Sequence, residues 1–536
     1  MKVLSLHSLG HDSGVSYFED GRLVYSMETE RLTRWKHDHR IALAVRHCLA
    51  QPQVDADGID LVAVSSPVRE SVLRIPDLNR AMAAVNGGAP HYRTTCDLLG
   101  RTVDCVIVTH EVSHAALALQ YAGHPDGCLV LTNEGRGQIS HSSLFQYAEG
   151  RLEWVETEPL PWYGTGFGWS AFGYLFGFGK GPSVAGKVMA LGGYGQPSTA
   201  VRELLEGIDD RILSDRAMAE RVGAELLARP GFVQDFEQRA DCIATLQQMF
   251  TESVHAALAK HIDAAGRDDV PLALGGGCAL NVVANAHLRK RFDRDIAIPP
   301  ACGDAGHSLG AGVYALRFLY GLPVEPFGVY LNGEAETEDE IRETIMAAAL
   351  NPLPYEPAAA ARVLAGGGVV AMVGGPSESG PRALGNRSLL GSPDVAGMRK
   401  RLSERLKERE WFRPLGAVMR TEVFQELFPG APPSPYMLFN YDVPEGLIPE
   451  ARHVDGTSRL QTVGREQNPR LHHLLEEFER MSGTPALINT SLNARGRAIA
   501  HRAHDALMDF RERDVDLFVL GNLMAYNGGR ARPPRK

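Results

Sequence analysis

The sequence predicts an α/β protein of two domains, and three observations carry this prediction. At 536 residues the chain exceeds the length at which a single hydrophobic core keeps growing. Several short apolar runs lead directly into glycine-rich loops, as strands do when they end at a ligand site. A proline-bearing stretch at residues 351–354 then precedes a helix, a glycine turn and a strand that begin a new unit. We therefore predict domains at residues 1–352 and 353–536.

The first domain opens with a strand, a loop and a hairpin. Apolar runs at residues 3–6 and 15–18 flank the loop, and Asp20-Gly21 joins the second run to a third at 22–26. A Rossmann or P-loop site would place a helix straight after its glycine loop. Strand, glycine loop and hairpin is instead how ATPases of the actin, hexokinase and heat-shock-chaperone type begin. This order predicts an actin-like ATPase-type fold for the first domain.

Glycine loops follow three later strand-like runs, at residues 128–132, 272–274 and 296–298. Such loops present backbone NH groups at strand ends, and NH groups bind phosphates. They predict one ATP site assembled from several segments. Between about residues 193 and 265 the pattern changes to charged helical periodicity, which predicts a helical insert. The candidate nucleotide-binding residues in these loops are Asn133, Gly135, Gly137, Gly275, Gly276 and Gly277.

His110 and His114 are four residues apart at the start of an alanine-rich helical stretch, so their imidazoles share a face. The segment matches His-Glu-x-x-His, a short pattern that also occurs by chance among ordinary core or surface histidines. A zinc protease is disfavoured, because no His-x-x-Gly-x-x-His extension follows. Asp304, in a glycine loop at a strand end, is a candidate third ligand. The three residues would form a two-histidine, one-carboxylate transition-metal site with open positions.

The loop at residues 10–14 contains His11 and Asp12, and two interpretations stay open. In the first, Asp12 and Ser13 cap NH groups of the loop. In the second, His11 is a general base, because its reference pKa of about 6.5 lies near working pH.

The second domain concentrates cationic residues beside glycine and proline turns, in blocks at 378–388, 407–414, 453–459 and 489–493. A solvated cation needs no rigid turn to hold it, whereas bidentate phosphate recognition does. Phosphate binding is therefore predicted. For Arg387 and Arg409 a structural salt bridge is the alternative.

Composition limits the partners. A net charge of -10 and a pI near 6.0 argue against a nucleic-acid-binding surface. No run of about 18 apolar residues and no leader pattern is found, so we expect a cytoplasmic protein that binds neither nucleic acid nor membranes. The 7 cysteines are scattered, without Cys-x-x-Cys, which predicts reduced core thiols.

Taken together, these segments resemble the nodulation and antibiotic carbamoyltransferase family, which includes tobramycin and cephamycin carbamoyltransferases. Any one segment is weak, but their order over nearly the whole chain is specific. Two departures are Glu134, where relatives show Asp, and Pro376, where an Arg often stands. The matching segments are residues 10–14, 30–37, 110–114, 186–191, 275–281 and 304–306, with all four cationic blocks.

The resemblance implies a first domain like the ATP-binding subunit of the tRNA threonylcarbamoyladenosine machinery and a second domain like its adenylate-forming partner, YrdC. The second domain would make carbamoyladenylate from carbamoyl phosphate and ATP, with Mg²⁺. The first domain would transfer the carbamoyl group to a hydroxyl of a secondary metabolite, a sugar or a macrocycle. By family resemblance, a homodimer is expected.

The resemblance also assigns roles to residues. His110, His114 and Asp304 would hold a divalent transition metal, typically Fe²⁺. Catalytic residues would be His11, as the base for the acceptor hydroxyl, with Asp12 beside it and Lys36 near the nucleotide, and Asn281 joins the nucleotide-binding set. Residues that would hold carbamoyl phosphate and ATP are Arg382, Lys407, Arg413, Arg459, Asn489 and Ser491.

Two rival functions remain. An actin-fold sugar kinase would leave the cationic blocks unexplained and would release ADP in place of AMP. An ATP-regulated binding or chaperone module would show no dependence on carbamoyl phosphate.

Overall fold

The computed structural model describes residues 1–8, 11–65, 72–179, 182–208, 215–227, 231–266 and 268–528. Gly10, which the predicted loop at 10–14 includes, lies outside the described residues. The chain forms two compact units. One consists of Met1–Val24 and Val45–Phe327, and the other of Tyr25–Ala44 and Gly328–Lys536.

This division differs from the predicted domains, because the second unit begins before residue 353 and includes residues 25–44. Within the second unit, β13 (Tyr330–Asn332) pairs with β16 (Ser377–Glu378). The buried carboxylate of Glu28 accepts a hydrogen bond of 2.7 Å from the backbone NH of Gly380. Pairing between segments so far apart leaves no local signal in the sequence, so the proline-bearing stretch marked the wrong place.

The first sheet of the first unit has the strand order β2-β1-β4-β7-β6-β5. In it, β1 runs antiparallel to β2 and parallel to β4. The predicted opening is confirmed, and Asp20 takes a positive φ of 49° in the hairpin turn before β3. The strands here are β1 (Lys2–Ser8), β2 (Ser13–Glu19), β4 (Leu61–Ser65), β5 (Leu73–Arg74), β6 (His91–Leu98) and β7 (Arg101–Val108), while β3 (Arg22–Glu28) crosses the division between the units.

A second sheet in the same unit has the order β10-β9-β8-β11-β12. Its central strand β8 again runs antiparallel to its hairpin partner β9 and parallel to β11. Both sheets therefore place an antiparallel hairpin beside parallel strands, and in the second sheet β8 and β11 lead into glycine-rich loops. The strands are β8 (Cys128–Asn133), β9 (Ser142–Ala148), β10 (Arg151–Thr157), β11 (Leu272–Gly275) and β12 (Ile296–Ala297).

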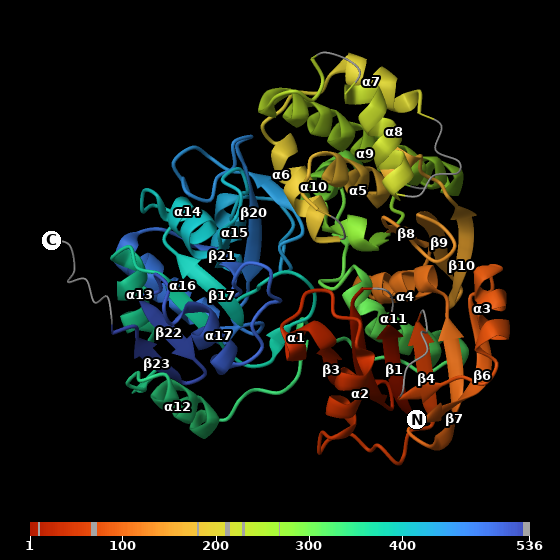
Figure 1. Cartoon of the computed structure of the whole chain (residues 1–536), viewed down its shortest axis with the longest axis horizontal. Coiled ribbons are helices and arrows are strands. Elements are labelled where there is room, and N and C mark those ends of the chain that lie inside the picture. Colours follow the sequence, from red (N-terminus) through yellow and green to blue (C-terminus); the bar gives the residue numbers. More distant parts are fainter. Residues whose placement is uncertain are drawn as a thin grey trace. The chain divides into compact units, whose positions relative to one another are not determined.

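Two helices pack against each other between these sheets, α4 (His110–Ala122) and α11 (His307–Tyr314) (Figure 1). Contacts of α11 are with β1, β2 and β4, while α4 contacts β8 and β11. Their first turns approach closely, because a Cβ on Gly310 would lie only 2.0 Å from the carbonyl oxygen of Ser113. Glycine at this position lets the two helix starts meet, and both helices begin with a histidine.

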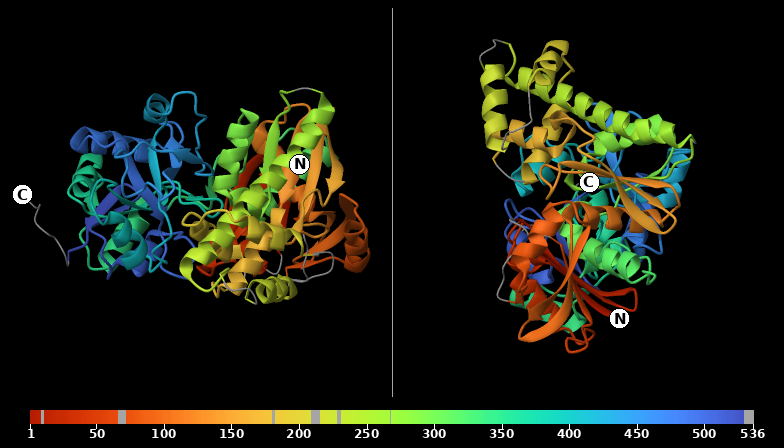
Figure 2. Two further views of the ribbon diagram at one scale, coloured as in Figure 1. Left: turned by 90° about the horizontal axis from the view of Figure 1, so that it is seen from above. Right: turned by 90° about the vertical axis from the view of Figure 1, so that its right-hand side faces the viewer.

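The predicted helical insert is confirmed. Its longest member, α9 (Phe236–Ala265), has 30 residues and is the long helix in the right-hand view of Figure 2. Asp235 caps it by accepting a 2.9 Å hydrogen bond from the NH of Gln238. The other helices of the first unit are α3 (Leu78–Asn86), α5 (Gly166–Leu175), α6 (Ala185–Gly192), α7 (Thr199–Glu206), α8 (Asp215–Leu227) and α10 (Val282–Phe292), while α2 (Ile41–Leu49) crosses the division.

The second unit contains a mixed sheet of order β14-β23-β22-β15-β17-β21-β18-β20-β19. Mixed α/β architecture is thus confirmed for both units. The strands are β14 (Leu353–Pro354), β15 (Val370–Val373), β17 (Arg387–Gly391), β18 (Gly416–Arg420), β19 (Asn440–Asp442), β20 (Thr457–Val463), β21 (Ala486–Ser491), β22 (Leu517–Leu520) and β23 (Leu523–Tyr526). The helices are α1 (Thr29–Thr33), α12 (Glu338–Ala347), α13 (Pro357–Ala365), α14 (Met398–Lys400), α15 (Thr421–Leu427), α16 (Pro469–Ser482) and α17 (Ala503–Phe510).

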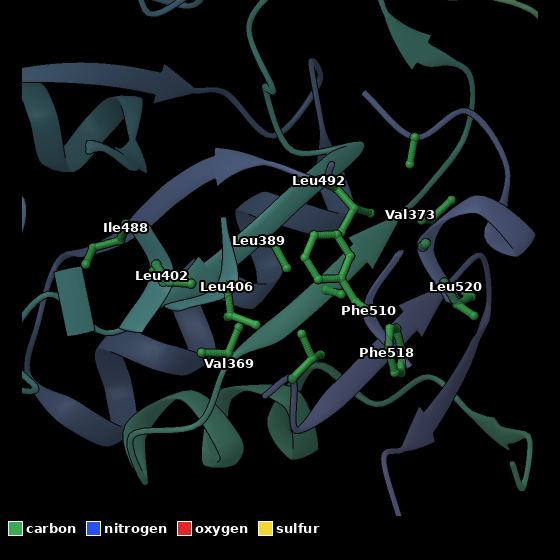
Figure 3. Close-up of a cluster of buried hydrophobic side chains, with 14 of the residues drawn as sticks. Val369, Val373, Leu389, Leu402, Leu406, Ile488, Leu492, Phe510, Phe518 and Leu520 are labelled. Carbon is green, nitrogen blue, oxygen red and sulfur yellow. The ribbon is translucent and has the colours of Figure 1, made fainter. Parts of the chain in front are cut away.

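Alternation along the strands divides the core of this unit between the two faces of the sheet. Ala371 and Val373 belong to one apolar cluster, with Phe510 of α17 (Figure 3). Val370 and Met372 belong to the other, which α13 and α16 cover. The period of two is that of a strand buried on both faces. Burial on both faces fixes the register of β15, and with it the place where the strand ends.

All seven cysteines are free, and Cys278 alone among them is not fully buried, in agreement with the prediction of reduced thiols. Within the described part of the chain, no helix is both long and apolar enough to cross a membrane.

Candidate functional site

The starts of α4 and α11 bring four side chains together in the first unit. Ligand atoms of His110, His114, Asp304 and His307 all lie within 4.8 Å of one another. The Oδ1 atom of Asp304 is 3.5 Å from Nε2 of His114 and 3.5 Å from Nε2 of His307. Three of the four are the predicted metal ligands. The sequence-based prediction missed His307, although Asp-x-x-His at the start of a helix puts both side chains on one turn.

Glu134, which follows β8, faces the same histidines. Its carboxylate pairs with Nε2 of His110, and its Oε1 atom lies 2.7 Å from Nε2 of His114. The NH of Gly277 donates to the same oxygen at 3.2 Å. The departure from the family pattern at this position therefore lies inside the site.

The ionisable groups of this cluster change one another's pKa values. Burial acts to lower the pKa of His114, but the carboxylates of Glu134 and Asp304 outweigh it and raise the pKa to about 10. The pKa of His110 is raised for the same reason. For Asp304, burial and then the charge of Glu134 raise the pKa. Protons on imidazoles thus balance carboxylates that have little access to water.

A divalent transition metal fits this donor set. Metal binding replaces protons on histidine, and imidazole with carboxylate is a ligand combination suited to iron, manganese or zinc. The buried Nε2 atom of His307 makes no hydrogen bond among the described residues, which is expected of a nitrogen whose lone pair faces a cation site. The group therefore fits a metal better than a set of structural ion pairs.

Glu111, the central residue of His-Glu-x-x-His, turns away from the histidines. Its Oε1 atom accepts hydrogen bonds from the NH groups of Ile139 at 2.7 Å and Ser140 at 3.1 Å. A zinc protease would need this carboxylate as a base at the metal. Its structural role supports the prediction that the chain is not such a protease.

His11 and Asp12 lie at the accessible edge of the cluster. Nδ1 of His11 is 3.0 Å from Oδ2 of Asp12 and 3.5 Å from Oδ2 of Asp304. The hydrogen bond to Asp12, against burial and with the help of Asp304, raises the pKa of His11 to about 9. The pKa of His11 thus lies above the reference value of about 6.5 on which the general-base interpretation was based, because two carboxylates stabilise its charged form.

The predicted glycine loops surround this cluster. A Cβ on Gly276, whose φ is +84°, would lie 2.3 Å from the carbonyl oxygen of Asn133, so the two loops touch through a glycine. Gly277 has open space around its Cα. A Cβ on Gly275 would lie 3.1 Å from the backbone of His114, and the loop is therefore close to the first turns of α4.

Other members of the predicted nucleotide set have structural partners. Asn133 donates to the carbonyl oxygen of Gly164 at 2.9 Å. The carbonyl oxygen of Gly135 is 2.8 Å from the ring of His141, and a Cβ on Gly137 would lie 2.2 Å from the carbonyl oxygen of Ser140. These residues shape the loop that ends β8.

Asn281 has a role that the prediction did not give it. Its side-chain oxygen accepts a 3.1 Å hydrogen bond from the NH of Ala284 and caps α10. Its amide donates to Gln247 of α9 at 3.1 Å. Both contacts stabilise the start of α10.

The second unit holds a cationic cluster, which we define as Arg382, Lys407, Arg409, Arg413 and Arg459; the lysine is buried and the arginines are half-buried. Lys407 is 2% exposed. Burial and then the charge of Arg413 lower the pKa of Arg409 to about 9. Burial and then the charges of Arg382 and Arg409 lower the pKa of Arg459 well below its ordinary value. These shifts show cations that lie close together with too little negative charge between them.

The end of β21 and the residues directly after it supply the acceptors that hold Lys407. The ammonium of Lys407 donates to the carbonyl oxygen of Ser491, to its hydroxyl at 2.9 Å and to the side-chain oxygen of Asn493 at 2.7 Å. Asn489 donates to the side chain of Gln461 at 2.8 Å, and its buried Oδ1 atom makes no hydrogen bond. The predicted carbamoyl phosphate and ATP residues are thus brought together.

The two arginines for which a structural salt bridge was the alternative have different surroundings. Arg387 is structural, since it donates to the carbonyl oxygens of Gly374 and Gly375 at 2.9 Å each and to that of His501 at 2.8 Å. Arg409 belongs to the cationic cluster, where it donates to Thr490 at 3.2 Å.

Lys36, predicted as catalytic with His11, belongs to the second unit. Its charge is among those that lower the pKa of Lys407 well below its ordinary value, after burial and Arg409. Two residues before Lys36, Arg34 donates a hydrogen bond of 2.8 Å to the carbonyl oxygen of Ala498. This contact explains why the segment belongs to the second unit. Lys36 therefore extends the cationic cluster.

One unit of this mixed α/β chain holds a cluster of candidate metal ligands and the other holds a cationic cluster, and both arrangements are typical of enzymes. Residues 2–72 and 84–313 match the family described as Carbamoyltransferase N-terminus, and residues 361–527 match Carbamoyltransferase C-terminus. The chain belongs to the carbamoyltransferase family, and it is a transferase.

Curated relatives agree over nearly the full length. The chain is 30% identical to the 3'-hydroxymethylcephem-O-carbamoyltransferase of Amycolatopsis lactamdurans, over 96% of this chain and 97% of that protein. It is 30% identical to nodulation protein NolNO of Sinorhizobium fredii, over 96% of this chain and 78% of that protein. Among solved structures, the activator of the 2-hydroxyisocaproyl-CoA dehydratase from Clostridium difficile covers 59% of this chain and 94% of its own, at 13% identity and a TM-score of 0.35. That score supports no assignment.

Proposed function

We propose that this protein is an O-carbamoyltransferase that activates a carbamoyl group in its second unit and transfers it to an acceptor hydroxyl in its first unit. The observation that carries this proposal is the contrast between the two clusters within one carbamoyltransferase chain. In the cationic cluster the carboxylate of Glu410, 3.7 Å from Arg413, offsets only part of the positive charge. In the first unit, imidazole and carboxylate ligand atoms lie close enough together to hold a cation. Each therefore fits a different step of the reaction.

Activation is assigned to the cationic cluster. One carbamoyl phosphate, one ATP and one water would give carbamoyladenylate, phosphate and pyrophosphate. Arg413 and Arg459 would bind phosphate oxygens through charge-assisted hydrogen bonds, and Lys407, already held by β21, would add a point charge. Binding an anion would relieve the mutual repulsion that lowers the pKa of these cations. The unit would thus resemble an adenylate-forming domain of the YrdC type.

Transfer is assigned to the first unit, which would have an actin-like ATPase-type fold. His110, His114 and Asp304 would hold a divalent transition metal such as iron, which supplies positive charge beside the adenylate. A cation in the cluster would offset the charge of Asp304, which contributes to the raised pKa of His11, and would favour the neutral ring. His11 would then take the proton from the acceptor hydroxyl through Nε2, while Asp12 orients its ring through Nδ1. The acceptor oxygen then forms the carbamate ester, and AMP leaves.

Glycine-rich backbone near these residues supports a nucleotide at this site. Gly277 has open space where a side chain would stand, and its NH already donates to the cluster. We infer that the acceptor is a hydroxyl of a secondary metabolite, because the relative from Amycolatopsis is named for carbamoyl transfer to a hydroxymethyl group of a cephem.

The test is mass spectrometry of products from ATP, carbamoyl phosphate and a panel of hydroxylated sugars, macrolides and cephems. We expect AMP and an acceptor that carries one added carbamoyl group, formed only when carbamoyl phosphate is present. Release of ADP with a phosphorylated acceptor would instead identify a sugar kinase. ATP binding or turnover that ignores carbamoyl phosphate would identify an ATP-regulated binding module.

A further inference from the structure

The metal-ligand cluster contains one more imidazole than a two-histidine, one-carboxylate site requires. His307 is the first residue of α11, three residues after Asp304. Its Nε2 atom lies 3.5 Å from Oδ1 of Asp304, the same distance that separates this oxygen from Nε2 of His114. His307 thus faces the shared carboxylate as closely as an assigned ligand does.

Its ring orientation is fixed by a partner on the opposite side. Nδ1 of His307 lies 3.2 Å from the hydroxyl oxygen of Ser65, at the end of β4. A hydrogen bond from Nδ1–H to this hydroxyl leaves the lone pair on Nε2, the nitrogen that points into the cluster. Metal-binding histidines in proteins are usually held in this way, with the second ring nitrogen bound to an outer partner.

An ordinary core histidine would explain less. The ring of His307 packs 4.1 Å from that of His110 and 4.0 Å from that of His114, and side chains at such spacing can simply fill space. A buried Nε2 atom that makes no hydrogen bond is costly in that case, and a phenylalanine would fill the same volume without the cost. A cation on the Nε2 side removes the cost.

We propose that His307 is a fourth protein ligand, through Nε2, for the metal assigned to His110, His114 and Asp304, and that Ser65 positions it. This inference rests on the proposed function, which places a metal in the cluster. Three imidazoles and one carboxylate leave fewer open positions than the predicted three-ligand set. They also favour borderline ions such as Fe²⁺, Co²⁺ or Zn²⁺ over Mg²⁺, which prefers oxygen ligands.

The experiment uses the full chain, stripped of metal with a chelator and titrated with Co²⁺, whose visible absorption reports the number and geometry of its ligands. Affinity is measured in parallel by chelator competition. The variants are His307→Phe, which keeps a ring in the packed space, Ser65→Ala, His110→Ala as the assigned-ligand reference, and His124→Ala as a control at a half-buried histidine outside the cluster.

We expect wild type and His124→Ala to bind Co²⁺ with the same spectrum and affinity. Ser65→Ala should keep the spectrum but bind roughly 10- to 100-fold more weakly, the usual effect of losing an outer partner. His307→Phe should bind more weakly still and change the spectrum. Circular dichroism checks folding, and His307→Gln replaces His307→Phe if that variant does not fold.

The two hypotheses fail in different ways. If His110→Ala loses Co²⁺ while His307→Phe and His307→Gln keep the wild-type spectrum and affinity, the fourth ligand is wrong and the metal site stands. If His110→Ala also keeps both, or wild type binds no Co²⁺, the metal assignment itself is overturned.

Discussion

The two units hold clusters of different charge: carboxylates with imidazoles in the first unit, and an excess of cations in the second. In the first unit, carboxylates and imidazoles surround a space where ligand atoms lie within 4.8 Å of one another, and protons on histidine balance the charge. In the second unit, several cations lie close together, and burial with their mutual repulsion lowers the pKa of Arg409 to about 9. In the proposed function, a cation would complete the first cluster and an anion the second. Activation of the carbamoyl group and its transfer would then take place at different clusters of one chain.

The largest effect is expected for a substitution in the first unit. His11→Ala removes only the proposed proton acceptor, and positioned acid–base catalysis contributes roughly 10²- to 10⁴-fold. Carbamoyl transfer to a hydroxyl acceptor should therefore fall by about this factor, while carbamoyl-phosphate-dependent pyrophosphate release continues. Both are measured on the same preparation, and an equal loss of the two activities would show that His11 does not act in transfer alone.

A smaller effect is expected on the side of the second unit. Arg413→Ala or Arg459→Ala removes a charge-assisted phosphate contact worth roughly 1.5–3 kcal/mol, or more than about tenfold in binding. Pyrophosphate release should fall at least this much, and transfer with it. Arg465→Ala, at an arginine with 64% of its side chain exposed, is the matched control and should keep full activity. Normal pyrophosphate release by both cluster variants would place activation elsewhere.

The smallest expected effect is a loss of stability at low pH, and it should be similar in the two units. Burial lowers the pKa of His124 in the first unit and of His453 in the second to about 4. Since the unfolded chain then binds a proton before the folded one, stability is complete above about pH 6.5 and falls as the pH drops toward 4. With screening by solvent, we expect a loss of about 1–2 kcal/mol for each.

Urea unfolding of wild type, His124→Gln and His453→Gln at pH 7 and pH 4.5 measures this loss. Each variant should lose less unfolding free energy on acidification than wild type does. An identical acid response in all three proteins would mean that neither histidine is held neutral by burial.

Local patterns in the sequence were enough for much of the fold. The Asp20-Gly21 turn predicted the opening hairpin, and the four-residue spacing of His110 and His114 predicted their common face. Contacts between segments far apart in the chain could not be predicted from local patterns. Nothing near Lys36 shows that its segment belongs with Lys407, because that association depends on residues more than 300 positions later.

Two features of the site that were not predicted have local signals in the sequence. Asparagine directly before a helix is a common cap, which would have explained Asn281 without a nucleotide. His307 follows Asp304 by three residues at a helix start, a spacing that puts two donors on one turn. The pKa of His11 could not be foreseen, because it depends on Asp304, which only the packing of α11 brings near.

The most direct test of the two-site division is pyrophosphate release by wild-type protein from ATP and carbamoyl phosphate with no acceptor present. We expect release that requires carbamoyl phosphate, persists in His11→Ala and is lost in Arg459→Ala. If the acceptor instead attacked carbamoyl phosphate directly, with ATP only as an effector, wild type would release no pyrophosphate under these conditions. That result would contradict activation in the second unit.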